Sequence, residues 1–152
     1  MRLPDRDADS GSAIVEFVFV AIVIMVPLMY LIVVVAQVQR NQLAVSQAAR
    51  DAGRAFATST TPAQAATRVD AAVRLAFADQ GLPDDATVRF VAAGAGCGSG
   101  VITPRLAAGA QFAVCVTRRA HLPGVPSVLS GRGVTMTSEF VVHVDDFRYF
   151  AS

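Results

Sequence analysis

The sequence predicts an α+β protein built from a transmembrane helix that continues into a long helix, a second helix, and a small antiparallel sheet. Three observations lead to this prediction. Residues 17–36 contain no charged side chain, apolar residues recur at helical spacing between 45 and 77, and they alternate with polar residues between 134 and 144. The chain has 152 residues, enough for one domain of ordinary size and an appendage.

Composition excludes two broad classes of protein. Hydrophobic residues make up 53% of the chain, above the roughly 45–50% typical of soluble domains, which excludes a disordered chain and indicates a membrane segment. Thirteen basic and twelve acidic side chains give a net charge of +1, so no strong electrostatic field attracts the chain to nucleic acid. Nucleic acid is therefore not an expected partner.

The first element is the apolar run at residues 17–36. About 20 helical residues at 1.5 Å each cross a hydrocarbon core of about 30 Å. A buried core helix is the alternative, but such a helix keeps a polar stripe. A cleavable secretory signal is a second alternative, although its apolar region spans only about 7 to 15 residues. The run therefore predicts a single membrane span in contact with lipid.

A carboxylate stands at the start of this run. Glu16 is one of only two glutamates in the chain, and a charge inside a bilayer is costly. A capping box beginning at Ser12 would need its acid at position 15, which is Val15. The remaining structural explanation is an acid in a first helical turn, stabilised by the helix dipole.

The residues before and after Glu16 carry a resemblance to a known family. A short charged leader ending in Gly11, followed by an apolar segment whose fifth residue is Glu16, resembles the processing site of type IV prepilins. With Phe17 after the glutamate and a single membrane helix, the chain is similar to the TadE family of pilin-like proteins of tight-adherence pilus systems. A weaker likeness continues into the C-terminal part, in the strand pattern of Phe112, Val114 and Val116 and in the last threonine-rich strand.

This resemblance implies a pilin-like fold and a set of roles. Prepilin peptidase would cleave after Gly11, and Ser12 would carry the new amine. The chain would then consist of a leader (1–11), a transmembrane helix (12–36) and an extracytoplasmic α+β domain (37–152). Glu16, followed by Phe17, would set the register between subunits by attracting the free N-terminus of a neighbour. The implied partners are prepilin peptidase, other pilin-like subunits and the pilus assembly platform.

Two helical patterns follow the membrane span. The first helix is expected to continue past residue 37, because apolar residues recur on one face: Val45, Ala48, Ala49, Ala52 and Phe56. A second helix is expected to start at Thr61-Pro62, with Thr61 as its cap and Gln64 completing a capping box. Its predicted apolar face is Ala66, Val69, Val73, Ala76 and Phe77. Asp70 is expected to pair with Arg74, and Gly81 to end the helix.

Three strands are predicted after residue 86, at Thr87–Val91, Gln111–Thr117 and Val134–Val144. The third has the clearest pattern. Its expected buried face consists of Val134, Met136, Phe140, Val142 and Val144, with polar residues between them. A small antiparallel sheet lying against the helices completes the α+β domain.

The two cysteines indicate on which side of the membrane the C-terminal domain lies. Cys97 and Cys115 flank a glycine-rich loop without the CxxC spacing of zinc or redox sites. A disulfide outside the cytoplasm fits them best, and two reduced buried thiols are the alternative. Arginine counts near the span do not place the N-terminus inside. The expected location is the cell membrane, single-pass, with the C-terminal domain extracytoplasmic.

No pattern indicates catalysis, a metal or a cofactor. The run 94–100 lacks the third glycine of a dinucleotide-binding loop, and His121 and His143 are too scattered for a metal site. No nucleophile motif is present. We therefore expect no enzyme. The resemblance implies a minor pilin or pseudopilin, or an assembly component, of a tight-adherence pilus or related secretion system, acting in adhesion. The minor role is expected because the external domain is large compared with the short subunits that resemble major pilins. The alternatives are an uncleaved, membrane-anchored scaffold or sensor, and a membrane-tethered hydrolase with an unrecognised site.

Overall fold

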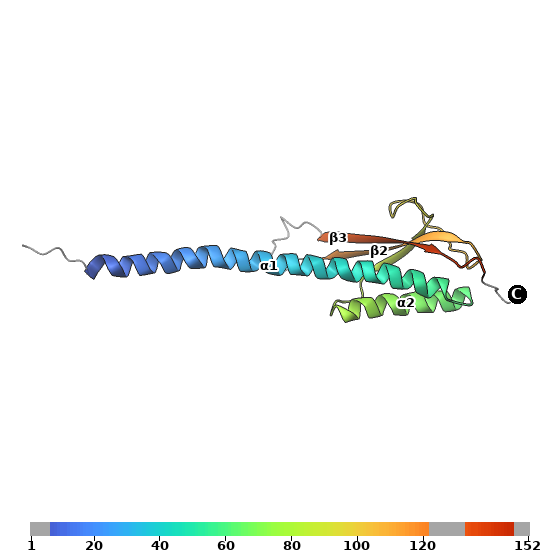
Figure 1. Cartoon of the computed structure of the whole chain (residues 1–152), viewed down its shortest axis with the longest axis horizontal. Coiled ribbons are helices and arrows are strands. Elements are labelled where there is room, and N and C mark those ends of the chain that lie inside the picture. Colours follow the sequence, from blue (N-terminus) through green and yellow to red (C-terminus); the bar gives the residue numbers. More distant parts are fainter. Residues whose placement is uncertain (1–6, 122–132, 148–152) are drawn as a thin grey trace, which may run out of the picture. The chain divides into compact units, whose positions relative to one another are not determined.

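The computed structural model describes residues 7–121 and 133–147, with side chains from Ala13 onward. Its elements, in order, are α1 (Asp7–Ala57), α2 (Pro62–Asp79), β1 (Thr87–Val91), β2 (Gln111–Ala120) and β3 (Val134–His143). Along the chain, the helices precede a three-stranded sheet, and the colours of Figure 1 follow this order. The predicted α+β class is thus confirmed, including the second helix and the small antiparallel sheet.

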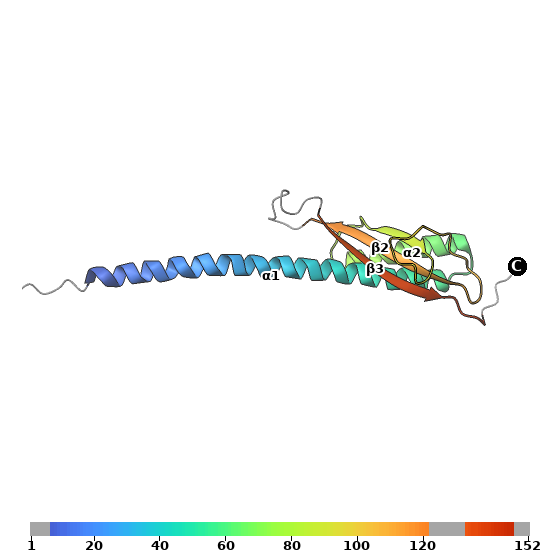
Figure 2. The same ribbon diagram turned by 90° about the horizontal axis from the view of Figure 1, so that it is seen from above.

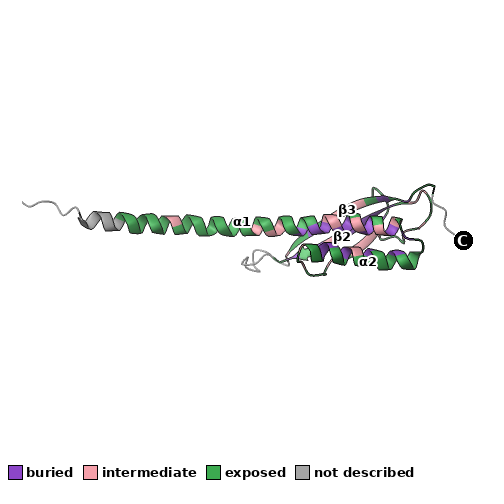
Figure 3. Cartoon of the chain, turned by 60° about the horizontal axis from the view of Figure 1, so that its bottom comes forward, coloured by how far each residue is buried: buried purple, intermediate pink, exposed green. Residues whose placement is uncertain are grey.

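The chain divides into two compact units, Met1–Ala36 and Gln37–Ser152. The described part of the first unit is helical throughout, because α1 begins at Asp7 and continues past Ala36. Its side chains from Ala13 to Ala36 are almost all exposed (Figure 3). This unit therefore has no core of its own among the described residues.

The second unit holds the hydrophobic core. Here α2 runs back along α1, and the sheet lies beside this helix pair (Figures 1 and 2). The predicted face of α1 is confirmed, because each of its five residues is buried: Val45, Ala48, Ala49, Ala52 and Phe56. Three of these residues are alanines, whose small side chains allow neighbouring elements to pack closely against α1.

The start of α2 follows from its sequence, with one difference. The Thr61 side chain accepts a hydrogen bond from the Gln64 backbone N–H at 3.2 Å, as expected for a cap. The Gln64 side chain, however, accepts from the Thr60 backbone N–H at 2.8 Å and from the Thr60 hydroxyl at 2.7 Å. The reciprocal bond therefore reaches one residue further back than in a standard capping box.

The buried face of α2 differs from the prediction at one position. Val69, Val73, Ala76 and Phe77 are buried as expected, but Ala65 takes the place of Ala66. Ala65 lies one full turn before Val69 and so shares its face, whereas Ala66 is exposed. The predicted ion pair is present on the solvent side, with 3.2 Å between Arg74 Nη2 and Asp70 Oδ2.

The sheet is antiparallel, with β2 between β1 and β3. The first strand has the predicted bounds, the second extends three residues beyond Thr117, and the third ends one residue before Val144. Val144 still pairs, since its N–H donates to the Ala110 carbonyl at 2.9 Å. On β3 the alternation holds for Met136 and Val142, whereas Val134 at the strand start is exposed.

The central strand is buried on both faces. Its inner face packs on the helices, where Phe112 and Phe56 have ring centroids 4.9 Å apart and Phe90 of β1 completes an aromatic cluster. On the outer face, Ala113 and Cys115 are covered together with Val91 and Cys97. A loop over the outer face therefore replaces the simple alternation expected for a sheet with one wet side.

Candidate functional site

The apolar surface of α1 is the most prominent feature of the N-terminal unit. The stretch Ala13–Ala57 contains a helix long and apolar enough to cross a membrane, and none of its most apolar window is buried within the chain. A core helix of a soluble protein would bury one face. The exposed apolar side chains thus need lipid or another protein around them.

Glu16 and Phe17 lie at the N-terminal end of this surface. Both side chains are exposed, and their neighbours Ile14, Val15 and Val18 are exposed and apolar. Because α1 begins at Asp7, Glu16 lies beyond the first helical turn, where a helix dipole no longer stabilises an acid appreciably. The first-turn explanation of Glu16 therefore does not apply to the helix as it stands.

Gly11 and Ser12 lie within the helical backbone of α1, four and five residues after its start at Asp7. The leader residues 1–6 and the side chain of Ser12 lie outside the part of the chain that the structure describes. A glycine weakens a helix by roughly 1 kcal/mol relative to alanine. The Gly11–Ser12 bond is thus located at a weak point of a helix close to its N-terminal end.

Cys97 and Cys115 are joined by a disulfide, with their Cα atoms 5.6 Å apart. Cys115 is buried on the outer face of β2, and Cys97 belongs to the loop that follows β1. This loop turns at Gly94 and Gly96, whose φ angles of 78° and 76° favour glycine. The disulfide fixes the loop over the sheet.

The two sulfur atoms also lie close to a carboxylate. Among the described residues, Cys97, Cys115 and Glu139 are the group whose ligand atoms come within 4.8 Å of one another. A metal would need thiolates, whereas both sulfurs are engaged in the disulfide. His143 lies elsewhere, with its Nε2 3.1 Å from Asp146 Oδ2 at the exposed end of β3.

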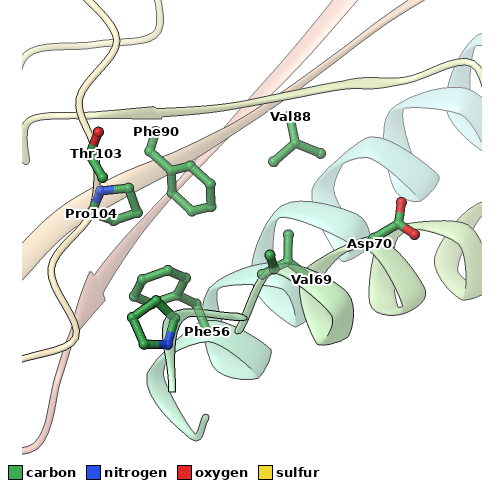
Figure 4. A pocket seen from close by; sticks show the side chains of 9 residues that line it. Phe56, Val69, Asp70, Val88, Phe90, Thr103 and Pro104 are labelled. Carbon is green, nitrogen blue, oxygen red and sulfur yellow. The ribbon is translucent and has the colours of Figure 1, made fainter. Parts of the chain in front are cut away.

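An apolar pocket of about 360 Å³ opens between the helices and the sheet edge. Figure 4 shows Phe56, Phe90 and Pro104 gathered at one end and Asp70 at the other. Its size would accommodate a small apolar group. Neither this pocket nor its lining was indicated by a motif, because the residues come from four separate segments of the chain.

A second, polar cleft of about 450 Å³ lies on the outer face of β1 and β2. It is lined by Asp85, Thr87, Arg89, Thr117, Arg119 and His121. Of these residues only His121 was a candidate from the sequence, as a metal ligand. The arginines were missed because nothing in the linear sequence shows that they lie on neighbouring strands.

The comparisons with known proteins concern the first part of the chain. Residues 11–54 match the family model described as TadE-like protein. The chain carries a TadE-like segment. It begins at Gly11, includes Glu16 and the apolar helix, and ends within α1. No curated protein and no solved structure matches the chain.

This match confirms the resemblance carried by Gly11 and the first helix. The TadE-like segment covers less than half of the chain and does not reach the sheet, so the weaker likeness of the strands has no support from it. Together, the TadE-like segment and the unburied apolar helix indicate a pilus-associated membrane protein with an N-terminal membrane anchor.

Proposed function

We propose that the protein is a minor pilin or pilus-assembly component of a tight-adherence pilus or related secretion system, with a structural and adhesive role rather than a catalytic one. The observation that carries the proposal is that the TadE-like segment starts at Gly11. Prepilin peptidase cleaves after Gly11, and the helix that begins at Ser12 inserts beside the helices of other pilin-like subunits and the assembly platform.

The position of Glu16 supports an assembly role. In the processed chain, Glu16 is the fifth residue of a helix that otherwise exposes apolar side chains. A carboxylate in an apolar packing interface favours one partner strongly, because an unpaired charge there is costly. The free amine of Ser12 on a neighbouring subunit is that partner, and Phe17 packs next to the pair. Correct pairing then fixes the axial register of the subunits.

A shallow groove on the same helix supports close packing of another helix. It is lined only by apolar residues: Phe17, Val18, Ala21, Ile22, Met25 and Val26. Its lining includes the small side chain of Ala21, and a small residue lets a second helix approach closely. Lipid alone would fill the groove less specifically than a complementary helix.

The extracytoplasmic position of residues 37–152 is the second part of the proposal. A disulfide between Cys97 and Cys115 persists in oxidising compartments and is rare in the cytoplasm. The domain that carries it therefore lies outside, and the preceding helix anchors the chain as a single-pass protein. Adhesion or contact with other subunits is then the task of the exposed domain.

A second candidate function is an uncleaved, membrane-anchored scaffold or sensor of the envelope. One observation favours it: the Gly11–Ser12 bond belongs to a helix that already begins at Asp7. Proteases bind extended backbone, so the first turns would have to unwind before cleavage. That unwinding is modest in cost near a helix end containing glycine, which is why the processed form is preferred.

These two candidates are distinguished by determining the N-terminal residue and the intact mass of the membrane-extracted protein. The protein is expressed once with and once without a prepilin peptidase. The proposal expects a start at Ser12 only when the peptidase is present. A Gly11→Val variant should remain uncut, because a branched side chain blocks the site, whereas Ser10→Ala should be cut normally. A start before Ser12 in every sample would establish the uncleaved anchor instead.

A further inference from the structure

The open part of the outer sheet face carries a cleft rich in hydrogen-bond donors. We propose that this cleft binds an oxyanion group, a carboxylate or a phosphate, on a small ligand such as an acidic sugar or a phosphorylated compound. The inference concerns the domain alone and holds whether or not the leader is cleaved. Its basis is the juxtaposition of Arg89 and Arg119 in one cleft.

The strand register brings these residues together. Thr87 of β1 lies opposite Thr117 of β2, which lies opposite Thr137 of β3. Because the strands are antiparallel, Arg89 and Arg119 lie on opposite sides of this threonine row, each two residues from it, and they project to the same face. Together with His121, the two guanidinium groups thus border a row of hydroxyl groups.

The threonine row has donor and acceptor capacity. The hydroxyl oxygens of Thr117 and Thr137 lie 3.0 Å apart and share one hydrogen bond. The hydroxyl of Thr87 lines the cleft on the other side of Thr117. A ligand oxygen that approaches this row can accept from a hydroxyl as well as from a guanidinium. Such mixed donor sets suit carboxylate, phosphate and sugar hydroxyl groups.

The two arginines of the cleft, Arg89 and Arg119, have no ion-pair partner in the part of the chain that the structure describes. The acid that lines the cleft, Asp85, is already paired, because its Oδ1 lies 2.6 Å from Nε of the buried Arg118. Like charges that share a cleft without counter-ions attract an anion from solution.

The other acid on this face, Glu139, forms no ion pair with Arg89 or Arg119 among the described residues. Glu139 lies opposite Cys115, and Cys115 lies opposite Arg89 on its other side. Glu139 and Arg89 are therefore separated by a whole strand, roughly 9–10 Å between backbones. At the end lined by Arg119, the acid of the lining is Asp85, which is paired with Arg118, so the Arg119 guanidinium is left to bind an anion.

One arginine is held in place by the disulfide loop. Nη2 of Arg89 donates to the Ser99 carbonyl at 3.4 Å, a long hydrogen bond, and Ser99 lies two residues after Cys97. Arg89 is half-buried, whereas Arg119 is exposed. The loop thus limits the positions of one guanidinium while the other can close on a ligand. The planar fork of arginine matches two oxygens of one oxyanion.

The cleft has the size of a small-ligand site. Its volume of about 450 Å³ falls in the range of about 300–1,000 Å³ for such sites. The polar lining excludes a purely apolar ligand, since desolvating two guanidinium groups without replacement hydrogen bonds is costly. A single acidic sugar or phosphorylated group fits both the volume and the donors.

The test is calorimetric titration of the full chain, in an uncharged detergent at constant ionic strength, with inorganic phosphate and with galacturonate. We expect saturable binding of at least one probe. Arg119→Gln and Arg89→Gln should each weaken it by about tenfold or more. The matched control is Arg50→Gln, which removes the same charge from the exposed face of α1 and should leave the affinity unchanged.

Each outcome of the titration either identifies the class of ligand or contradicts the proposal. Tighter binding of phosphate identifies a phosphoryl ligand, and tighter binding of galacturonate an acidic sugar; both support the cleft. Absence of saturable binding with either probe overturns it, as does equal weakening by Arg50→Gln. Arg119 is exposed, so its variant should keep the thermal midpoint of the original protein, and undiminished affinity in both cleft variants would also overturn the assignment.

Discussion

Nη1 of Arg118 on β2 donates a hydrogen bond to Oδ1 of Asn41 on α1 across 2.9 Å, and both side chains are buried. The Asn41 amide is itself oriented, because its Nδ2 donates to the Gln37 carbonyl at 2.8 Å. The guanidinium carbon lies 5.4 Å from the Phe77 ring centroid on α2. One cation therefore connects both helices to the central strand.

The counter-ion of Arg118 is more exposed than Arg118 itself. Side-chain exposure is 51% for Asp85 and 6% for Arg118. Although Nε of Arg118 lies 2.6 Å from Asp85 Oδ1, its N–H lacks an aligned acceptor among the described residues. The contact is therefore electrostatic rather than a directed hydrogen bond. This difference in exposure determines which of the two substitutions lowers the free energy of unfolding less.

The first prediction is that Asp85→Asn destabilises the domain more than Arg118→Met. Removing the Asp85 carboxylate leaves a buried cation without its counter-ion and should lower the free energy of unfolding by about 3 kcal/mol. This is the lower end of the range for broken buried ion pairs, because half of the carboxylate is exposed to water. Replacing Arg118 by methionine removes the charge and leaves only the Asn41 amide oxygen unpaired, about 1–2 kcal/mol. Methionine also keeps a favourable contact with Phe77.

These two variants are compared by chemical unfolding of the full chain in an uncharged detergent. The double variant Asp85→Asn/Arg118→Met provides the control, and it should be about as stable as Arg118→Met alone, because the buried cation that needed Asp85 is gone. Equal costs for the two single changes, with additive costs in the double variant, would show that the ion pair contributes nothing to stability.

The second prediction concerns the close approach of α1 and β3 at Gly53. A Cβ atom at this position would lie 2.6 Å from Phe140 Cδ1 and 2.7 Å from Val142 Cγ2. Overpacking of this kind costs about 1–3 kcal/mol, and alanine recovers up to about 1 kcal/mol through its higher helix propensity. With the full recovery of about 1 kcal/mol, Gly53→Ala should therefore lower the unfolding free energy by up to about 2 kcal/mol.

Gly98→Ala is the matched control for Gly53→Ala. A Cβ at Gly98 meets no atom within 4 Å, and its φ is not positive, so the stability should change by less than about 0.5 kcal/mol. The free energy of unfolding of both variants is measured in the same detergent. A Gly53→Ala protein more stable than the original would mean that helix propensity outweighs the contact with Phe140.

Much of the fold was predictable because its signals are local. The spacing of Val45 and Phe56, the cap at Thr61 and the alternation of Met136 and Val142 each follow from a few neighbouring residues. The burial of Arg118 was not predictable in this way. Its partners Asn41 and Asp85 lie 77 and 33 residues away in the sequence, and a charged residue in a strand is ordinarily assigned to solvent.

The candidate sites differ in the same way: one is marked by a local sequence motif, and the other depends on contacts between distant residues. Gly11 and Glu16 were found because their spacing is a linear motif, and the family match begins at that motif. The cleft was not found, because Arg89 and Arg119 lie on strands whose register only the structure gives. The double-sided burial of β2 likewise depends on the disulfide loop, which a strand pattern does not describe.

The third prediction is that Cys97 and Cys115 are oxidised in the native protein and stabilise the domain. Closing a loop with a sequence separation of 18 contributes about 3 kcal/mol in the chain-entropy model. Maleimide should label neither cysteine in protein extracted from intact cells, and both after reduction under denaturing conditions. Rapid labelling of the untreated protein would contradict the bond and, with it, the extracytoplasmic position of the domain.

Stability provides the matching control for the cysteine pair. Reductant should lower the unfolding midpoint of the original protein, because it opens the loop. The same reductant should not change the midpoint of the double variant Cys97→Ser/Cys115→Ser, which lacks the bond from the start. Equal responses of the two proteins would mean that the reductant acts elsewhere and that the disulfide does not contribute.

The last prediction is that Glu16→Gln impairs incorporation into an assembly while leaving processing intact. Glutamine keeps the size and polarity of the side chain but loses the charge that attracts a neighbouring Ser12 amine. A hydrogen bond to a charged group contributes about 1.5–3 kcal/mol, so the association constant should fall by at least about tenfold. Incorporation is measured as the fraction of processed subunit in sheared surface fibres.

Glu139→Gln is the matched control, because Glu139 is the other glutamate of the chain and lies exposed on β3. Normal incorporation of both variants would refute the register role of Glu16, whereas loss of cleavage in Glu16→Gln would assign the residue to recognition by the peptidase.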